Sequence, residues 1–124
     1  MPQVVIVDIW LRQSQNGTKL QNMRVIAVST LRNYWTKHPD AQRPLQSWLA
    51  EVLAANWKTP AEVKATFRNA SVLAGRRVGF NIKGNDYRLI VAVAYVFGAV
   101  YIKFVGTHAE YDRINAITVE PKPR

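Results

Sequence analysis

Residues 78–105 read VGFNIKGNDYRLIVAVAYVFGAVYIKFV, and this stretch decides the fold. It contains three apolar, β-branched runs, at residues 78–82, 87–96 and 100–105. The runs are separated by Lys83-Gly84-Asn85-Asp86 and by Phe97-Gly98, which are both good hairpin turns. The stretch therefore predicts an antiparallel meander of three strands. Both alternating sets of side chains in the middle run are mostly apolar, so we expect a central strand with helices over at least one face.

The chain before the meander predicts one strand followed by a first helix. Residues 24–28 are apolar and partly β-branched, which is typical of a short strand. Ser29 or Thr30 can cap the helix that follows, and Leu31, Tyr34 and Trp35 recur at helical spacing. Pro39 has no backbone N–H, so the helix is expected to end before it.

Two further helices are expected between this first helix and the meander. Asp40 can cap the second, with Pro44 in its first turn and an apolar stripe that consists of Leu45, Trp48, Leu49 and Val52. Thr59-Pro60-Ala61-Glu62 is a capping box with proline at the first helical position, and it predicts a short helix through about residue 67. The order β-α-α-(α)-β-β-β predicts an α+β fold, with a helical hairpin packed on a small antiparallel sheet.

Length and composition set the class of protein. A chain of 124 residues with 48% hydrophobic and 20% charged residues fits one globular domain. There are no cysteines, which excludes disulfides, thiolate zinc sites and cysteine nucleophiles and makes the cytosol the natural compartment. No stretch approaches the ~20 apolar residues of a membrane span, and residues 4–10 lack the basic flank of a secretory signal.

The charge favours an anionic partner. Seventeen Lys+Arg against eight Asp+Glu give a formal net charge of +9, which attracts polyanions from a distance. Nucleic acid is the first expectation, although acidic lipid or an acidic protein would meet the same field. The basic residues are scattered rather than contiguous, so charge alone identifies no target.

Candidates for acid/base chemistry follow the last strand. His108 and Tyr111 are three residues apart, a spacing that places them on one face of a helical turn. Histidine is a residue type that can act as acid or base, whereas Tyr111 can stack on a base or donate a proton, and the two roles can be exchanged. The alternative for His108 is a hydrogen-bonded histidine that fixes the exit of the strand.

Two cations lie within predicted strands. Arg88 sits among apolar neighbours, where a guanidinium is costly unless it meets a carboxylate, solvent or a phosphate. It is therefore a candidate phosphate clamp, and the alternative is an ion pair with Glu110 or Asp112. Lys103 can likewise stabilise a phosphate or extend to solvent from an exposed face.

Other polar residues near the meander have weaker signals. Arg68, Arg76 and Arg77 lead into its first strand and can contact a phosphate backbone or lie in a solvated loop. Asn81 precedes the first turn and Asn85 lies in it, and each is either a turn residue or a contact to a nucleotide. The string His108-x-Glu110-x-Asp112 has no specific ligand spacing, so we expect no metal site. The tryptophans at 35, 48 and 57 are expected in the core.

Two motifs carry a resemblance to a known family. These are FNI…GN…YRL across residues 80–89 and YI…FVGTHAEYD across residues 101–112, and the resemblance covers nearly all of residues 23–114. They resemble the HigB branch of the RelE-like toxins of type II toxin–antitoxin systems. Lys83 stands where such toxins often have glycine, Asp86 where lysine is frequent, and Lys103 where arginine is usual.

The resemblance implies a RelE-like fold and a ribosome-dependent mRNA endoribonuclease that needs no cofactor. Metal-free RNA cleavage requires a base for the 2′-hydroxyl, cations for the phosphorane and an acid for the departing 5′-oxygen. Candidates for these catalytic roles are Arg88, Lys103, His108 and Tyr111. Candidates for RNA binding are Arg68, Arg76, Arg77, Asn81 and Asn85.

The resemblance also implies partners and domain limits. Expected partners are mRNA, the ribosomal A site with its RNA, and a cognate helix-turn-helix antitoxin. The toxin–antitoxin complex is expected to bind DNA only through the antitoxin. The toxin domain is expected at residues 23–115, after an N-terminal extension of residues 1–22 and before a C-terminal tail of residues 116–124. Residues 4–6 and their neighbours can instead add an edge strand.

Two other classes of function remain open at this stage. A toxin of the same fold can inhibit DNA gyrase without cleaving RNA. A non-catalytic RNA-binding module would keep its salt-dependent affinity after the loss of His108 and Tyr111.

Overall fold

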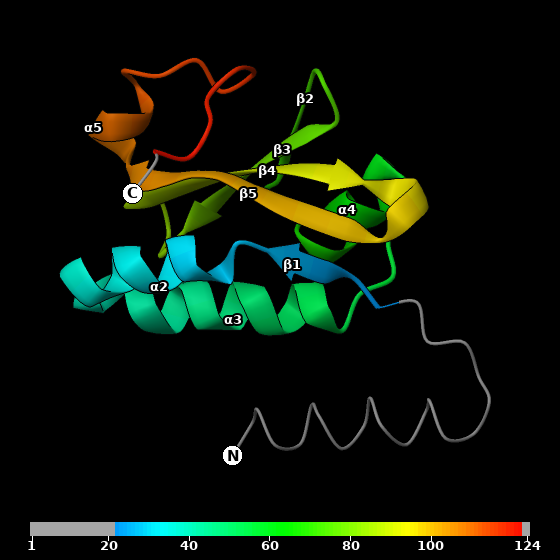
Figure 1. The fold of residues 1–124 in the computed structure, drawn as a ribbon, viewed down its shortest axis with the longest axis horizontal. Coiled ribbons are helices and arrows are strands. Elements are labelled where there is room, and N and C mark those ends of the chain that lie inside the picture. The colour runs from blue at the N-terminus through cyan, green and yellow to red at the C-terminus, as the bar shows by residue number, and fades with distance from the viewer. Residues whose placement is uncertain (1–21, 123–124) are drawn as a thin grey trace.

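A computed structural model describes residues 22–122 of the chain. A five-stranded mixed sheet has the order β1-β5-β4-β3-β2 and separates two layers (Figure 1). Its strands are β1 (Arg24–Ile26), β2 (Ser71–Leu73), β3 (Arg77–Ile82), β4 (Tyr87–Ala94) and β5 (Ala99–Thr107). The helices are α2 (Val28–Lys37), η1 (Pro39–Ala41), α3 (Gln42–Leu53), α4 (Pro60–Thr66), η2 (Tyr95–Phe97) and α5 (His108–Tyr111). The predicted α+β fold of RelE-like type is confirmed.

The predicted meander is present as β3, β4 and β5, with β4 at the centre. β1 adds to β5 in parallel, so the sheet is mixed rather than wholly antiparallel. β2, which the sequence did not suggest, pairs with β3 at the other edge. Lys83 has a φ of 54° in the turn between β3 and β4, a left-handed conformation that glycine adopts more readily than lysine.

The main core lies between the sheet and the helices α2, α3 and α4. Leu31, Leu45, Trp48 and Val52 from the helices pack in one cluster with Phe80, Leu89, Val91 and Ile102 from the sheet. Trp57 is also buried there, and Trp35 packs against the cluster from a half-buried position, so the expectation of core tryptophans is confirmed.

Two predicted helix starts are wrong. α2 begins at Val28 after Ala27, whose φ of 37° turns the chain out of β1, so neither Ser29 nor Thr30 is the N-cap. α3 begins at Gln42, and Asp40 lies in the preceding turn η1. The Asp40 carboxylate accepts a hydrogen bond from Tyr87 at 2.6 Å instead of capping the helix. By contrast, Thr59 caps α4 as predicted, by accepting from the Glu62 N–H at 3.3 Å.

The second face of the sheet carries α5 and the chain that follows it (Figure 1). Arg77, Gly79 and Asn81 on β3, Arg88 and Ile90 on β4, and Phe104 and Gly106 on β5 lie on this face by register. The register shifts between Ile90 and Val91, because Phe104 and Ile102 are their partners and Lys103 is the extra residue of a β-bulge. This face holds the candidate site.

Within residues 22–122, no helix is both long and apolar enough to cross a bilayer. The greater part of the predicted extension, residues 1–21, and the last two residues of the predicted tail lie outside the described residues.

Candidate active site

Arg88 lies at the centre of the candidate site. Its residue is 8% exposed, and its guanidinium carbon lies 4.6 Å from the centroid of the Tyr111 ring. Nη1 donates a hydrogen bond to the side-chain oxygen of Asn81, its partner across the β3–β4 pair. The expected alternative, an ion pair with Glu110 or Asp112, is absent from the part of the chain that the structure describes. A cation–π contact and a neutral amide therefore hold a nearly buried positive charge.

Two glycines leave room for neighbouring side chains in the site, Gly79 for Arg88 and Gly106 for Phe104 and Glu110. A Cβ at Gly79 would lie 3.1 Å from Arg88 Nη2 and 3.2 Å from Ile90 Cδ1. A Cβ at Gly106 would lie 2.6 Å from Phe104 Cζ and 2.8 Å from Glu110 Oε1. Both positions thus allow a large side chain to lie close to the backbone. The alternation along β3 was the signal that could have placed Gly79 beside Arg88.

α5 brings His108 and Tyr111 together. Thr107 and Glu110 form a reciprocal capping box, in which Thr107 Oγ1 accepts from the Glu110 N–H at 3.1 Å and Glu110 Oε1 accepts from the Thr107 N–H at 2.7 Å. The rings of His108 and Tyr111 have centroids 6.0 Å apart in an edge-to-face arrangement. His108 Nδ1 lies 3.6 Å from a carboxylate oxygen of Asp112, and the ring is partly exposed. The expected geometry of this pair is present.

Contacts with α2 and the 83–86 turn position α5. The Tyr34 hydroxyl donates to Glu110 Oε1 at 3.3 Å, and the His108 N–H donates to the Asp86 carbonyl at 3.2 Å. Burial of Tyr34, reinforced by the neighbouring Glu110 carboxylate, raises the pKa of its phenol. Tyr34 therefore remains a neutral donor at physiological pH.

Lys103 and Arg77 meet at a carboxylate that sequence reasoning missed. Glu120 accepts from Lys103 Nζ and from Arg77 Nη2, each at 2.8 Å. The hydrogen bond from Lys103, together with a smaller contribution from Arg77, lowers the pKa of Glu120 below its ordinary value. No local pattern could have revealed this contact, because Glu120 is 17 residues from Lys103 and 43 from Arg77.

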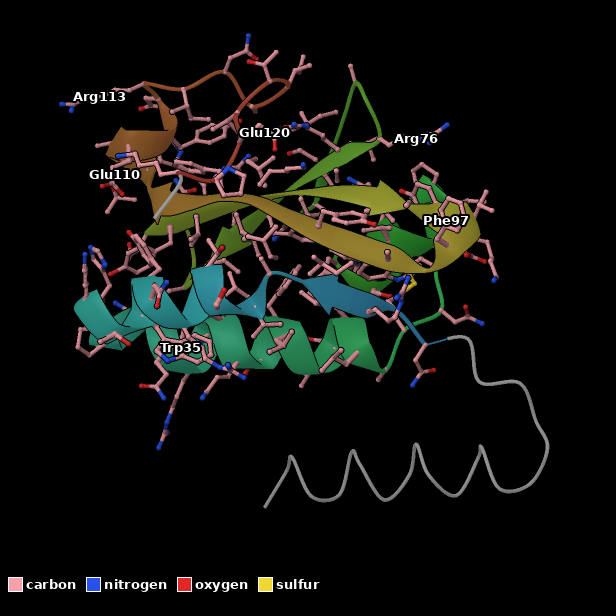
Figure 2. The ribbon with its side chains drawn as sticks, viewed as in Figure 1. Trp35, Arg76, Phe97, Glu110, Arg113 and Glu120 are labelled. Atoms are coloured by element: carbon pink, nitrogen blue, oxygen red, sulfur yellow. The ribbon has the colours of Figure 1, made fainter. Side chains whose placement is uncertain are left out.

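The remaining candidates for RNA binding are dispersed. Arg76 is exposed in the turn before β3 and points outward at the opposite end of the sheet from Glu110 (Figure 2). Arg68 is exposed after α4, and Asn85 is exposed in the 83–86 turn beside α5. Arg77 is 7% exposed and faces inward, so the run of basic residues does not form one surface. Among residues 22–122, no group of three or more acidic or histidine side chains is arranged to hold a metal.

Comparison with known proteins identifies the family. Residues 41–114, more than half of the chain, match the HigB toxin family, described as a RelE-like toxic component of a toxin–antitoxin system. The chain is 24% identical over 102 residues to the mRNA interferase HigB of Escherichia coli O6:H1, covering 81% of this chain and 99% of that protein. It is 27% identical over 97 residues to the mRNA interferase toxin HigB of E. coli K12, covering 77% and 93% respectively, and the Shigella flexneri mRNA interferase HigB gives the same values. The family match covers more than half of the chain, and the chain belongs to the HigB family of RelE-like toxins.

Proposed function

We propose that this toxin is an mRNA interferase, an endoribonuclease that cuts mRNA on the ribosome without a metal ion. The relatives named as mRNA interferases match over most of their length and support this substrate. The toxin domain spans residues 23–115. Arg88, Lys103, His108 and Tyr111 are its catalytic residues, and Arg68, Arg76, Arg77, Asn81 and Asn85 bind RNA.

The observation that carries the proposal is the guanidinium of Arg88. A nearly buried charge without a carboxylate is costly to folding, and a phosphate would supply the missing negative charge. Asn81 and the Tyr111 ring fix the plane of the guanidinium, so its fork is oriented before the substrate arrives. Such preorganised cations stabilise the charge of a phosphorane.

Two residues of α5 carry out the proton transfers. His108 accepts the proton of the 2′-hydroxyl, and the 2′-oxygen then attacks the phosphorus. The bond to the 5′-oxygen breaks, and Tyr111 supplies the proton that this leaving group takes. The products are a 2′,3′-cyclic phosphate and a 5′-hydroxyl end. The Asp112 carboxylate lies 3.6 Å from His108 Nδ1, where its negative charge faces the positive charge that the imidazole gains when it accepts the proton.

The ribosome supplies what one small domain lacks. The net charge of +9 directs the toxin toward ribosomal RNA, and the A site orders the mRNA so that the attacking hydroxyl is aligned. A cognate helix-turn-helix antitoxin neutralises the toxin in the cytoplasm, and the complex meets DNA only through that antitoxin.

The test is to map mRNA 5′ ends in cells within minutes of inducing the full chain. We expect new ends inside translated codons, and we expect them to disappear when translation initiation is blocked. The double variant Arg88→Ala, His108→Ala should give no new ends. Arg32→Ala removes an exposed arginine on α2, in the layer across the sheet, and should cleave like the parent chain.

Two outcomes would contradict the proposal. Growth arrest with intact mRNA and damaged DNA would favour inhibition of DNA gyrase. Crosslinking to mRNA without any cleavage, retained in the double variant, would favour a non-catalytic RNA-binding module.

A further inference from the structure

The chain after α5 crosses the second face of the sheet and stays there through polar contacts to two cations. We define residues 114–120 as the cross-sheet segment; Figure 2 shows its last residue, Glu120, above the strands. Arg77 Nη1 donates to the carbonyls of Ala116 at 3.2 Å and Val119 at 2.6 Å, and Nη2 donates to Glu120. Lys103 contributes the fourth hydrogen bond, also to Glu120.

The segment has little apolar attachment. None of residues 111–122 is buried, and Ile117 is 48% exposed. The match to the HigB family ends at residue 114, so residues 115–120 lie outside the matched region. Of the segment's four hydrogen bonds with Arg77 and Lys103, two are ionic bonds to the exposed Glu120 carboxylate, and a stronger anion can compete for the same two cations.

We propose that Arg77 and Lys103 form an RNA backbone-phosphate subsite, and that Glu120 occupies it until RNA displaces the cross-sheet segment. This inference rests on the proposed function, since it assumes that RNA lies on this face of the sheet.

The positions of the two cations fit a bridging anion. Arg77 lies on β3 and Lys103 on β5, the two strands that flank β4, so their backbones are about 10 Å apart. One carboxylate above β4 closes that gap with both hydrogen bonds at 2.8 Å. The small side chain of Ala92, the β4 partner of Arg77, lies between the two strands. A phosphate has the charge and the acceptor oxygens to make the same bridge.

The Arg77 end of the subsite lies apart from the proposed cleavage point, and Lys103, which is also among the proposed catalytic residues, lies at the end that joins the two. Arg77 and Asn81, the partner of Arg88, are four residues apart on one face of β3, which corresponds to about 13 Å. This distance is a few nucleotides at the ~3.4 Å rise of a stacked strand. One RNA strand can therefore contact Arg88 and the subsite with different phosphates.

The test measures the binding of a 2′-O-methyl hexauridylate, which cannot be cleaved, to the full chain without ribosomes. Glu120→Gln keeps the size of the side chain but removes the competing charge. We expect it to tighten binding about three- to fivefold, because it removes a competing carboxylate that makes two ion pairs while itself remaining exposed. In a Lys103→Gln background the same change should have a smaller effect.

Glu51→Gln is the matched control. It makes the same change in net charge at an exposed position on α3, across the sheet from the segment. It should alter affinity much less than Glu120→Gln does. Thermal unfolding of each variant checks that the fold is intact.

A second measurement follows the segment itself. The backbone amides of Ile117 and Val119 should show fast, large-amplitude motion by NMR relaxation when the oligonucleotide saturates the parent chain. A segment that stays ordered on the sheet with RNA bound would overturn the inference. So would a Glu120→Gln variant that binds no more tightly than Glu51→Gln, or that shows no binding.

These results are independent of cleavage. Tighter binding in Glu120→Gln without new mRNA ends in cells would support the subsite while contradicting the nuclease. New ends with no effect of Glu120→Gln on binding would do the reverse.

Discussion

At the scale of single residues, Gly79 contributes to the candidate site because it has no side chain. Gly79 has an ordinary backbone conformation, so its value is the space it leaves for the Arg88 guanidinium. A methyl group there would press on Nη2 and on Ile90 Cδ1, both of them ends of flexible side chains. The fold can accommodate this displacement, but a prepositioned guanidinium cannot move without losing its alignment.

We therefore predict that Gly79→Ala separates activity from stability. The free energy of unfolding, measured with urea, should change by no more than about 1 kcal/mol. Replacing glycine stabilises the strand, while the slight shift of the neighbouring side chains costs stability. The rate of mRNA cleavage should fall about tenfold, the effect of about 1.4 kcal/mol in the barrier.

The double variant Gly79→Ala, Arg88→Ala tests the cause. If Gly79 acts through Arg88, the double variant should be no slower than Arg88→Ala alone. Additive losses would show that Gly79 acts by another route.

At the scale of elements, α5 is the shortest helix or strand that carries candidate catalytic groups. It has four residues, too few to be stable alone, so the capping box and the contacts from α2 must hold it. His108 and Tyr111 inherit their positions from these bonds. The proposed mechanism therefore requires that α5 is ordered.

Thr107→Val should disorder α5 while leaving the core intact. Removing the hydroxyl costs about 1 kcal/mol of capping energy, which is comparable to the stability of such a short turn. We expect the melting temperature to fall by only a few degrees and the rate of mRNA cleavage to fall much more. Thr107→Ser keeps the acceptor and should retain most activity; equal losses in both variants would contradict a role for the cap.

At the scale of the whole molecule, Asp40 links η1, the short turn between α2 and α3, to the sheet. It accepts from Tyr87 on β4 and from Lys83 Nζ at 3.3 Å in the 83–86 turn. The hydrogen bond from Tyr87, with a smaller contribution from Lys83, lowers the pKa of Asp40 below its ordinary value of 3.8. The same bond raises the pKa of Tyr87.

This network makes the stability of the fold depend on pH in the acidic range. Because the pKa of Asp40 is lower in the folded state, its ionised form contributes stability above pH 3.8 and loses it as the pH falls through the folded value. At pH 7 the free energy of unfolding, measured with urea, should thus be larger for the parent chain than for Asp40→Asn. This difference should shrink below pH 3.8. A difference that is constant from pH 7 to pH 2 would contradict this account. Glu51→Gln serves as the control for an exposed carboxylate.

The sequence by itself determined the parts of this protein that are set by local periodicity and turn chemistry. Alternation and hairpin turns predicted β3, β4 and β5, and the Thr59-Pro60-Glu62 pattern predicted the start of α4, because these signals act between neighbouring residues. The spacing of His108 and Tyr111 likewise anticipated their approach.

Only the tertiary structure decided the rest. The parallel pairing of β1 with β5, the use of Asp40 by Tyr87, and the bridge from Glu120 to Arg77 all join residues more than 40 positions apart. Arg88 contacts the Asn81 amide and the Tyr111 ring rather than the carboxylate of Glu110 or Asp112 on either side of that tyrosine. A polar side chain chooses among partners by distance in the folded chain, and that distance is not written in the local pattern of residues.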